Sequence, residues 1–353
     1  MALRRVQVTD FRCLHSATLE LDPHFTLISG PNASGKTSLL EAMYVLGRGR
    51  SFRTRRIEHL IRRGTESFVV FGEIESAQRC VPLGIEGRVT GVRAKVAGEK
   101  AATLAELALQ LPIQIIDPEV HRLIEEGPSR RRRFLDWGVF HVEHEFVGYW
   151  QRYHQVLRQR NAALKSRQGP VISAWDGDLV RYGELITEAR QRYVLALAEQ
   201  CAPIGASLLG QELTLSYRAG WLKDLTFAEA LAQSSQSDQE IGITQVGPHR
   251  AELGIRLEGL AVKDRISRGQ QKLLAAALLI AQINLFPDSA PIRPTLLLDD
   301  PAAELDDERL AKLILEVSAH AVQLVVTTLH GEFSAFGDPG KRFAISGGAV
   351  TPL

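Results

Sequence analysis

Three hydrophobic patterns occur in the first and last parts of the chain. Apolar and polar residues alternate over 3–11, whereas 25–29 is a continuous apolar run and 39–46 has apolar residues at helical spacing. Alternation predicts a half-exposed strand, a short apolar run a buried strand, and the longer period a helix. The same signals place further strands at 18–21, 68–74, 81–85, 91–97, 113–116, 213–217, 251–257, 295–298, 323–327 and 342–345, and helices at 273–285 and 307–319. These parts should therefore form an α/β fold with mixed sheets.

The middle of the chain follows a different pattern. Strand signals fade after residue 128, and charged segments with helical periodicity cover 130–165 and 178–208. The sequence Gln168-Gly169-Pro170 separates these segments, and Ser129 is suited to cap the first helix. This part is therefore expected to be mainly helical.

Strand signals return after the helical part, which suggests an insertion into a single α/β domain. A Gln- and Ser-rich stretch at 232–240 predicts a mobile loop close to the return point. We therefore expect one head domain, lobe I, formed by 1–128 and 240–353, with a helical arm, lobe II, at 129–239.

The overall composition limits the possible classes of protein. With 353 residues, 45% hydrophobic and 24% charged, the chain is typical of a globular protein of one or two domains. Its formal net charge of +1 means that any surface for nucleic acid must be local. Three cysteines far apart in sequence are typical of a reduced, cytoplasmic protein. The first residues do not resemble a signal peptide, and no apolar run approaches the ~20 residues that span a bilayer, so no membrane partner is expected.

One segment after the strand at 25–29 matches the phosphate-loop pattern G-x-x-x-x-G-K-[ST] in full. Its residues are Gly30, Pro31, Asn32, Ala33, Ser34, Gly35, Lys36 and Thr37. Glycine lets backbone N–H groups surround phosphate oxygens, and the helix start adds a partial positive charge. Lys36 is suited to the β- and γ-phosphates of ATP, and the Thr37 hydroxyl to Mg²⁺. The flanking strand and helix favour this interpretation over a chance match, although Ala33 stands where related loops often have Gly.

A pair of aspartates follows the apolar run at 295–298. Asp299 would lie at the carboxyl end of a buried strand, where it could hold Mg²⁺ through water. Asp300 would then orient or deprotonate the attacking water. Either aspartate alone could instead cap the turn that Pro301 begins. Together with the phosphate loop, the pair predicts the second element of an ATPase site.

The segment before the helix at 273–285 resembles the signature of ABC-type ATPases, usually written Leu-Ser-Gly-Gly-Gln. Here it reads Ile266-Ser267-Arg268-Gly269-Gln270. Ser267 is a good N-cap, Gly269 allows close approach of the backbone, and the helix start offers N–H groups to an anion. Alone, the segment would indicate only an ordinary capped core helix. The resemblance implies that Ser267, Gly269 and Gln270 contact the γ-phosphate of ATP held by a second subunit.

Two further segments complete the ABC-type set. Ala303-Glu304-Leu305-Asp306 resembles the D-loop, with Ala303 where Ser is commoner. The strand at 323–327 leads into hydroxyls where ABC proteins place a sensor of the γ-phosphate, and either Thr328 or His330 could fill that role. We therefore expect an ATPase site split between two subunits. Its expected catalytic residues are Lys36, Asp300, Ser267 and Thr328.

Further segments along nearly the whole chain resemble the RecF family of bacterial recombination-mediator ATPases, part of the ABC/SMC-like head group. They lie at 50–54, 117–119, 127–136, 158–161, 246–250 and 267–272. The resemblance implies a P-loop ATPase head with a short helical arm, an ATP-dependent homodimer around DNA, and slow ATP hydrolysis. It also implies RecR with RecO, and indirectly RecA, as partners in loading RecA onto gapped DNA, in replication restart and in the SOS response.

A basic cluster follows the phosphate-loop helix, with five arginines and no carboxylate over 48–56. Its members Arg50, Arg53, Arg55 and Arg56 are the candidate DNA-binding residues, since clustered cations bind phosphates. The resemblance to SMC-like heads suggests that Arg53 links bound ATP to DNA. The alternative is a solvated basic loop.

Four consecutive arginines at 130–133 would crowd a helix start, where the dipole disfavours cations by ~0.3–1 kcal/mol each. Such a placement requires nearby carboxylates or a bound anion. Salt bridges to Glu125, Glu126 or Asp136 and a role toward DNA or ATP are both open interpretations.

Three classes of function fit these motifs. The first is a DNA-repair mediator in which ATP assembles a dimer and weak ATPase activity releases it. The second is the nucleotide-binding subunit of a membrane transporter, against which the inserted arm and the basic cluster argue. The third is a DNA-binding mediator with little ATPase activity, because Asp300 stands where most ABC-type sites have the longer Glu.

Overall fold

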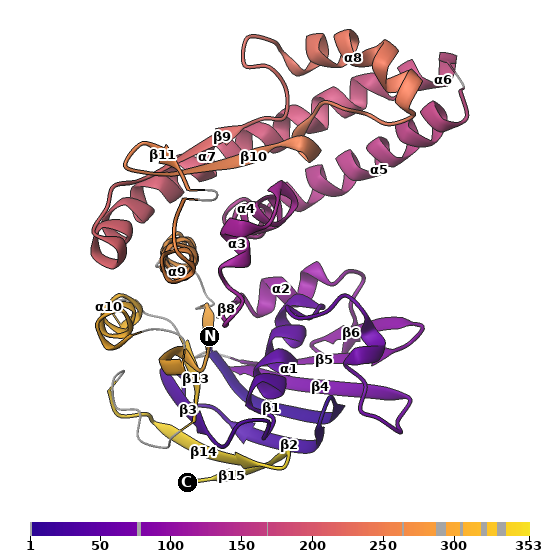
Figure 1. Ribbon diagram of the computed structural model, residues 1–353. Helices are drawn as coiled ribbons and strands as arrows, with labels where there is room; N and C mark the ends of the chain where they lie inside the picture. The colour runs from indigo at the N-terminus through magenta and orange to yellow at the C-terminus, as the bar shows by residue number, and fades with distance from the viewer. Residues whose placement is uncertain are drawn as a thin grey trace. The chain divides into compact units, whose positions relative to one another are not determined.

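The computed structural model describes residues 2–75, 79–167, 169–262, 265–286, 294–303, 306–318, 323–329 and 337–353. The chain divides into two compact units (Figure 1). Unit 1 consists of Met1–Val120 and Phe286–Leu353, and unit 2 consists of His121–Leu285.

The first sheet of unit 1 is antiparallel, with strand order β2-β1-β4-β5-β6-β7. Its strands are β1 (Ala2–Phe11), β2 (Leu14–Glu20), β4 (Ser67–Glu75), β5 (Cys80–Arg88), β6 (Gly91–Val96) and β7 (Glu99–Lys100). Buried and more exposed positions alternate along β4 and β5, as the sequence pattern predicts. One face of this sheet is therefore apolar.

The second sheet of unit 1 has strand order β15-β14-β3-β13-β12-β8, and every pair except β14–β15 is parallel. Its strands are β3 (Phe25–Ser29), β8 (Ile113–Ile116), β12 (Thr295–Asp299), β13 (Gln323–Thr328), β14 (Lys341–Ser346) and β15 (Ala349–Pro352). Every residue of β3, β12 and β13 is buried. Continuous burial is typical of central parallel strands covered on both faces, which explains their unbroken apolar sequences.

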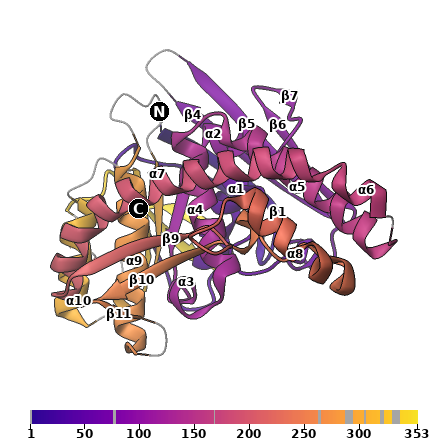
Figure 2. The ribbon, with the colours of Figure 1, turned by 90° about the horizontal axis from the view of Figure 1, so that it is seen from above.

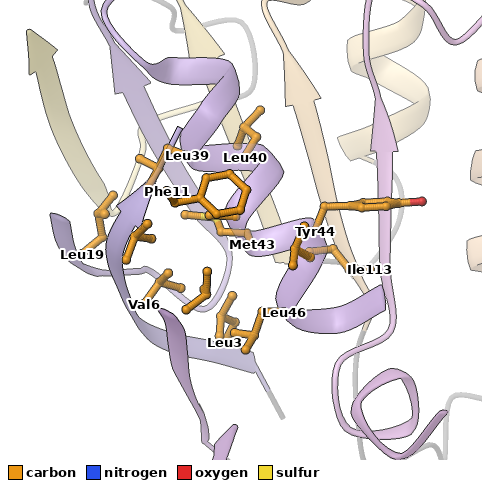
Figure 3. Close-up of a cluster of buried hydrophobic side chains, with 14 of the residues drawn as sticks. Leu3, Val6, Phe11, Leu19, Leu39, Leu40, Met43, Tyr44, Leu46 and Ile113 are labelled. Atoms are coloured by element: carbon orange, nitrogen blue, oxygen red, sulfur yellow. The ribbon is translucent and has the colours of Figure 1, made fainter. Parts of the chain in front are cut away.

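Helix α1 (Lys36–Arg48) contacts both sheets of unit 1 and forms the centre of its core. Its side chains Leu39, Leu40 and Met43 are fully buried and lie beside Phe11 and Leu19 of the first sheet (Figure 3). The shorter elements of unit 1 are η1 (Ile57–His59), α2 (Ala105–Gln110), η3 (Pro301–Ala303) and α10 (Asp307–Ser318). Because the first turn of α1 continues the phosphate loop, this core fixes the position of the predicted site.

Unit 2 is mainly helical and includes a three-stranded antiparallel sheet of order β11-β10-β9 (Figure 2). Its elements are α3 (Arg122–Glu125), α4 (Pro128–Val142), α5 (Phe146–Lys165), α6 (Gly169–Ser173), α7 (Asp176–Leu209), β9 (Leu213–Arg218), α8 (Phe227–Ile241), η2 (Pro248–Arg250), β10 (Glu252–Leu257), β11 (Leu260–Ala261) and α9 (Arg268–Asn284). Since β10 pairs with β9 and α9 packs on α7, this compact unit extends beyond the predicted arm at 129–239.

A buried polar cluster joins three helices of unit 2. Arg160 of α5 is 1% exposed and donates to Asp238 of α8 and to Asp176 of α7, each at 2.7 Å. It also donates to Thr244 Oγ1 at 2.8 Å. Asp238 is fully buried and cannot be hydrated. The ion pair with Arg160 therefore offsets the cost of burying both charges. The packing of α5, α7 and α8 therefore depends on charge as well as on apolar contact.

The turn at 247–250 is held in a similar way. His249 Nδ1 lies 2.6 Å from the Tyr153 hydroxyl, and Nε2 lies 3.1 Å from the Thr244 carbonyl oxygen. A carbonyl only accepts, so Nε2 carries the proton of the neutral ring and Tyr153 donates to Nδ1. Burial lowers the pKa of His249 to about 4. The ring is therefore neutral at pH 7 and is a structural part of this turn.

Two local predictions were wrong. The stretch at 232–240 lies within helix α8, which begins with a capping box between Thr226 and Glu229. This local start signal outweighs the weak helical preference of Gln and Ser. Helix α4 begins at Pro128 with Gly127 as its N-cap, not at Ser129, because proline favours the first helical position.

None of the helices in the part of the chain that the structure describes combines the length and the apolar character that a membrane crossing requires.

Candidate nucleotide site

The carboxyl ends of three neighbouring parallel strands meet at one edge of the second sheet of unit 1. Strand β13 lies between β3 and β12. β3 ends at Ser29, directly before the predicted phosphate loop, β12 ends at Asp299, and β13 ends at Thr328. Ligands of open α/β sheets bind outside such strand ends. The topology therefore brings together candidate residues from distant parts of the sequence.

The loop at 30–37 follows a path that requires glycine at two positions. Gly35 has φ of 113°, which residues with a Cβ rarely adopt. The Gly30 N–H donates to the Thr328 carbonyl oxygen at 3.2 Å. A Cβ on Gly30 would lie 2.2 Å from the Ile345 carbonyl oxygen. The backbone path of the loop therefore requires both glycines of the pattern G-x-x-x-x-G, in addition to any requirement of a ligand.

The start of α1 has unused donors. No side chain caps the helix at Gly35, so its first N–H groups lack the usual partner. Ser34 Oγ is buried and has no hydrogen-bond partner among the described residues. Lys36 is 6% exposed and donates to the carbonyl oxygens of Gly30 and Pro31 at 2.6 and 3.0 Å. Together these groups can bind a multiply charged anion such as a phosphate chain.

Two oxygen ligands suitable for Mg²⁺ lie beside this helix start. Thr37 Oγ1 donates to Asp299 Oδ1 at 3.1 Å, and Thr327 Oγ1 donates to the same oxygen at 2.8 Å. Mg²⁺ prefers oxygen ligands and retains several waters, so one hydroxyl and one carboxylate beside phosphate oxygens fit this ion. Among the described residues, no group of three His, Cys, Asp or Glu side chains could hold a metal by itself.

Asp300 has a strained backbone. Its φ is 47°, in the left-handed region that Asp tolerates better than most residues. Its N–H donates to the carbonyl oxygen and the hydroxyl of Thr327, at 3.2 and 3.1 Å. Strain that neighbouring bonds maintain is frequent at functional sites. The carboxylate of Asp300 can accept a proton or orient a water molecule in this place.

A cavity of about 350 Å³ connects these groups within unit 1. Its volume lies in the ~300–1,000 Å³ range of ligand pockets. The cavity is lined by 32–38 and by Asp299 and Asp300, and its remaining walls come from Cys13, Arg53 and Pro118. Lys36, Thr37, Asp299 and Asp300 therefore surround one space, whereas Thr328 is not among its walls.

An ion-pair cluster beside the cavity could not be predicted from motifs. Glu41 of α1 is fully buried and accepts two hydrogen bonds from Arg12, at 2.8 and 2.7 Å. Ser51 also donates to this carboxylate, and Arg53 Nη1 lies 3.6 Å from it. Ser51 Oγ accepts the N–H groups of Arg53 and Thr54. These bonds hold the basic segment against α1. The only signal of the cluster in the sequence was Glu41, a charged residue within the apolar pattern of a helix.

The four candidate DNA-binding arginines have different surroundings. Arg53 contacts Glu41 and lines the cavity. The side chains of Arg50, Arg55 and Arg56 are exposed and form no ion pair with any residue that the structure describes. A surplus of positive charge therefore lies next to the nucleotide cavity.

The predicted signature segment lies in unit 2, at the start of α9. Ser267 Oγ accepts the Gln270 N–H at 3.3 Å, and Gln270 Oε1 accepts the Ser267 N–H at 3.0 Å. This capping box confirms the predicted N-cap. The side chain of Ser267 is exposed, and Gly269 and Gln270 are partly exposed. The capping box uses the N–H groups of Ser267 and Gln270, so the first-turn N–H groups of Arg268 and Gly269 can still donate to an anion.

The four arginines at 130–133 all contact other residues of unit 2. Arg130 pairs with Glu126 at 3.0 Å. Arg131 donates to both carboxylate oxygens of Glu252, at 2.7 and 2.8 Å. Two of these four cations at the start of α4 are therefore paired with carboxylates. Glu126 was a partner expected from the sequence, whereas Glu252 of β10 was not.

Some predicted residues lie outside the part of the chain that the structure describes. They are Glu304 and Leu305 of the D-loop-like segment and His330, the alternative γ-phosphate sensor. Of the two candidate sensors, Thr328 is described, and it is buried at the end of β13.

Comparisons with known proteins place the chain in one group. The family described as RecF/RecN/SMC N terminal domain matches residues 2–342. The DNA replication and repair protein RecF of Pectobacterium atrosepticum is 39% identical over 357 residues, which cover 99% of each chain.

Two solved structures are similar along the whole chain. The recombination mediator protein RecF-ATP in the RecFOR pathway has a TM-score of 0.90 and 28% identity, covering 100% of this chain and 97% of that one. The RecF-ATPrS structure has a TM-score of 0.85 and 30% identity, covering 99% and 98%. The arrangement of the predicted nucleotide site therefore lies within a fold that has been solved with ATP.

Proposed function

The chain belongs to the RecF/RecN/SMC N terminal domain family, and we propose that it is an ATP-binding recombination mediator acting in DNA replication and repair. Its fold is the α/β head of this group with mixed sheets. The observation that carries the proposal is the cavity of unit 1, where the open start of α1 and Asp299 face the same space.

Within this proposal, each group at the cavity has a role. The N–H groups of the loop at 30–37 and the Lys36 ammonium bind the phosphates of ATP. Thr37 and Asp299 hold Mg²⁺, which supplies charge neutralisation at the phosphates when it is bound. Asp300 orients the attacking water, and Thr328 senses the terminal phosphate.

The second half of the site comes from another copy of the chain. Ser267, Gly269 and Gln270 lie in unit 2 and are suited to the γ-phosphate of ATP held by the partner's loop. ATP binding would therefore assemble a homodimer, and slow hydrolysis would release it. In this arrangement the helical segment at 129–239 is the arm, lobe II.

The partners follow from the same proposal. Arg50, Arg53, Arg55 and Arg56 bind DNA phosphates, which links DNA to the cavity through Arg53. RecR with RecO, and indirectly RecA, are the proposed protein partners, because the similar RecF structures belong to the RecFOR pathway.

The alternatives now differ in support. The family match and full-length similarity to RecF proteins argue against a transporter subunit. A mediator that binds ATP but barely hydrolyses it is still a candidate, since Asp300 has a shorter reach than Glu.

Replacing Lys36 tests the proposal. Lys36→Ala should weaken ATP binding roughly 100-fold, because charge-assisted hydrogen bonds contribute roughly 1.5–3 kcal/mol each. Titration calorimetry with ATP and Mg²⁺ measures this change. Lys312→Ala on α10 removes the same charge from an ion pair with Glu308 and should leave ATP affinity unchanged. Equal ATP affinity in wild type and Lys36→Ala would contradict the proposed site.

A further inference from the structure

Helix α5 of unit 2 has an exposed face without carboxylates. None of its 20 residues is Asp or Glu. Its exposed polar residues recur at helical spacing and form one stripe along the helix, which we name the α5 stripe. The members are Gln151, Arg152, Gln155, Arg158, Gln159 and Lys165. The other face of α5 packs against α7 (Figure 1).

The α5 stripe consists of hydrogen-bond donors. Arg and Lys side chains only donate, and each Gln can donate through its amide group. Two small exposed residues, Gly148 and Ala162, lie on the same face and allow close approach. A ligand that matches this face must be negatively charged and rich in acceptors, and the phosphate backbone of nucleic acid has both properties.

The cations of the α5 stripe are not engaged within the protein. The side chains of Arg152, Arg158 and Lys165 form no ion pair or hydrogen bond with any other described residue. By contrast, Arg192 on α7 pairs with Glu143 at 3.0 Å. The stripe cations therefore keep their full capacity for an external anion.

The charge pattern of α5 differs from that of its neighbour. The exposed charged residues of α7 are of both signs: Asp178, Arg181, Glu184, Glu188, Arg192 and Glu199. The whole chain is nearly balanced, with 42 Lys and Arg against 41 Asp and Glu. The bias of the α5 stripe is therefore local and does not follow from composition.

We propose that the α5 stripe binds the phosphate backbone of DNA. Arg152, Arg158 and Lys165 lie six and seven residues apart, which is about 9 and 10 Å along the helix at ~1.5 Å per residue. Phosphates of one DNA strand advance ~3.4 Å per base pair, so the axial spacing of these cations is about three phosphates. At about 100° per residue, Arg152 lies at one edge of the α5 stripe and Arg158 and Lys165 lie toward the other, so the long side chains approach a phosphate backbone from both edges of the stripe. The surface lies in unit 2, whereas the candidate arginines at 50–56 lie in unit 1. Binding of this kind is independent of base sequence.

Removing the three cations tests the proposal. The triple variant Arg152→Gln, Arg158→Gln and Lys165→Gln of the full chain is titrated with a short DNA duplex, with ATP present, over a range of salt concentrations. The slope of log affinity against log salt should fall by about 2 to 3, since each phosphate contact contributes about 0.9. The matched control, Arg181→Gln, Arg192→Gln and Lys223→Gln, removes equal charge from unit 2 and should keep the slope.

A single added charge provides a second test that removes no contact. Gln155→Glu places a carboxylate in the centre of the α5 stripe and should weaken DNA binding several-fold. Gln191→Glu makes the same chemical change at an exposed position of α7 and should have no effect. Unchanged melting temperatures would show that all variants are folded.

The outcomes separate this proposal from the function on which it rests. If wild type shows no salt-dependent DNA binding, both the DNA-binding function and the stripe are wrong. If wild type binds DNA and the triple variant and Gln155→Glu bind with the same affinity and slope, the stripe proposal alone is overturned. If these variants keep DNA binding but no longer bind a protein partner, the stripe proposal is also overturned, and the α5 stripe is a protein-binding surface.

Discussion

The polar groups at the cavity of unit 1 differ from those buried in unit 2. At the cavity, α1 begins without a side-chain cap and Ser34 Oγ has no partner among the described residues. In unit 2, Arg160 is bound to Asp176, Asp238 and Thr244, and His249 uses both ring nitrogens.

This difference separates ligand binding from folding. Polar groups that keep free bonding capacity are suited to a ligand, whereas polar groups that satisfy each other hold helices together. Substitutions at the cavity should therefore change ATP chemistry with little effect on stability, and substitutions in the cluster of unit 2 should do the reverse. The start of α9 is intermediate, because Ser267 is both a cap and a proposed phosphate ligand.

The largest expected effect is on hydrolysis. Asp300→Asn removes the proposed acceptor for the proton of water and should slow ATP turnover by roughly 10²–10⁴-fold. ATP affinity and the melting temperature should stay the same, and the ATP-bound dimer should last longer. Phosphate release under single-turnover conditions measures the rate. Asp307→Asn at the start of α10 is the control, and turnover faster than wild type in Asp300→Asn would contradict the role.

The next effect is on the stability of unit 2. Arg160→Met leaves Asp238 buried without its charge partner and should lower the free energy of unfolding by about 3–5 kcal/mol. Urea unfolding measures the loss. Adding Asp238→Leu to Arg160→Met should recover part of it, since both charges are then absent. A single variant as stable as wild type would show that the cluster does not hold α5, α7 and α8 together.

A third effect is a pH dependence from the same unit. The pKa of His249 is lowered to about 4 by burial, against about 6.5 in the unfolded chain. Between these values only the unfolded state is protonated, so the contribution to stability is complete above pH 6.5 and is lost as the pH falls toward 4. The loss is on the order of 3 kcal/mol. His249→Gln should reduce this dependence in urea unfolding at pH 7 and 5 without abolishing it, because burial also lowers the pKa of His154 to about 4. His24→Gln at an exposed position should not change it.

The smallest expected effect is at the start of α9. Ser267→Ala should lower the free energy of unfolding by about 1 kcal/mol, because it removes the cap. Thr226→Ala removes the matching cap of α8 and should cost about the same. Only Ser267→Ala should also weaken the ATP-dependent dimer in sedimentation. Equal dimerisation in the two variants would show that Ser267 is only a helix cap and does not contribute to the dimer.

Local patterns were sufficient to predict most of the strands, the phosphate loop and the cap of α9, but not the short strands β7, β11 and β15. The loop at 30–37 is recognisable because its function fixes residue types at fixed spacing between a buried strand and a helix. The error at 232–240 arose because Gln and Ser suggest a loop, while the capping box of Thr226 and Glu229 determines a helix.

Contacts between distant parts of the chain could not be predicted. The cluster of Arg12, Glu41 and Ser51 forms only once β1, α1 and the basic segment are packed together. The partner of Arg131 is likewise Glu252, far away in sequence, in place of a neighbouring carboxylate. Such pairs depend on tertiary structure, for which a single sequence has no periodic signal.

In the proposed assembly, ATP joins two copies of the chain through the loop of unit 1 and the start of α9 of unit 2. Sedimentation velocity of wild type and Ser267→Arg, each with ATP, ADP or no nucleotide, tests it most directly. Wild type should form a dimer only with ATP, and Ser267→Arg should bind ATP yet remain a monomer. A wild-type chain with the same sedimentation in all three conditions, or an ATP-dependent dimer of Ser267→Arg, would contradict the claim.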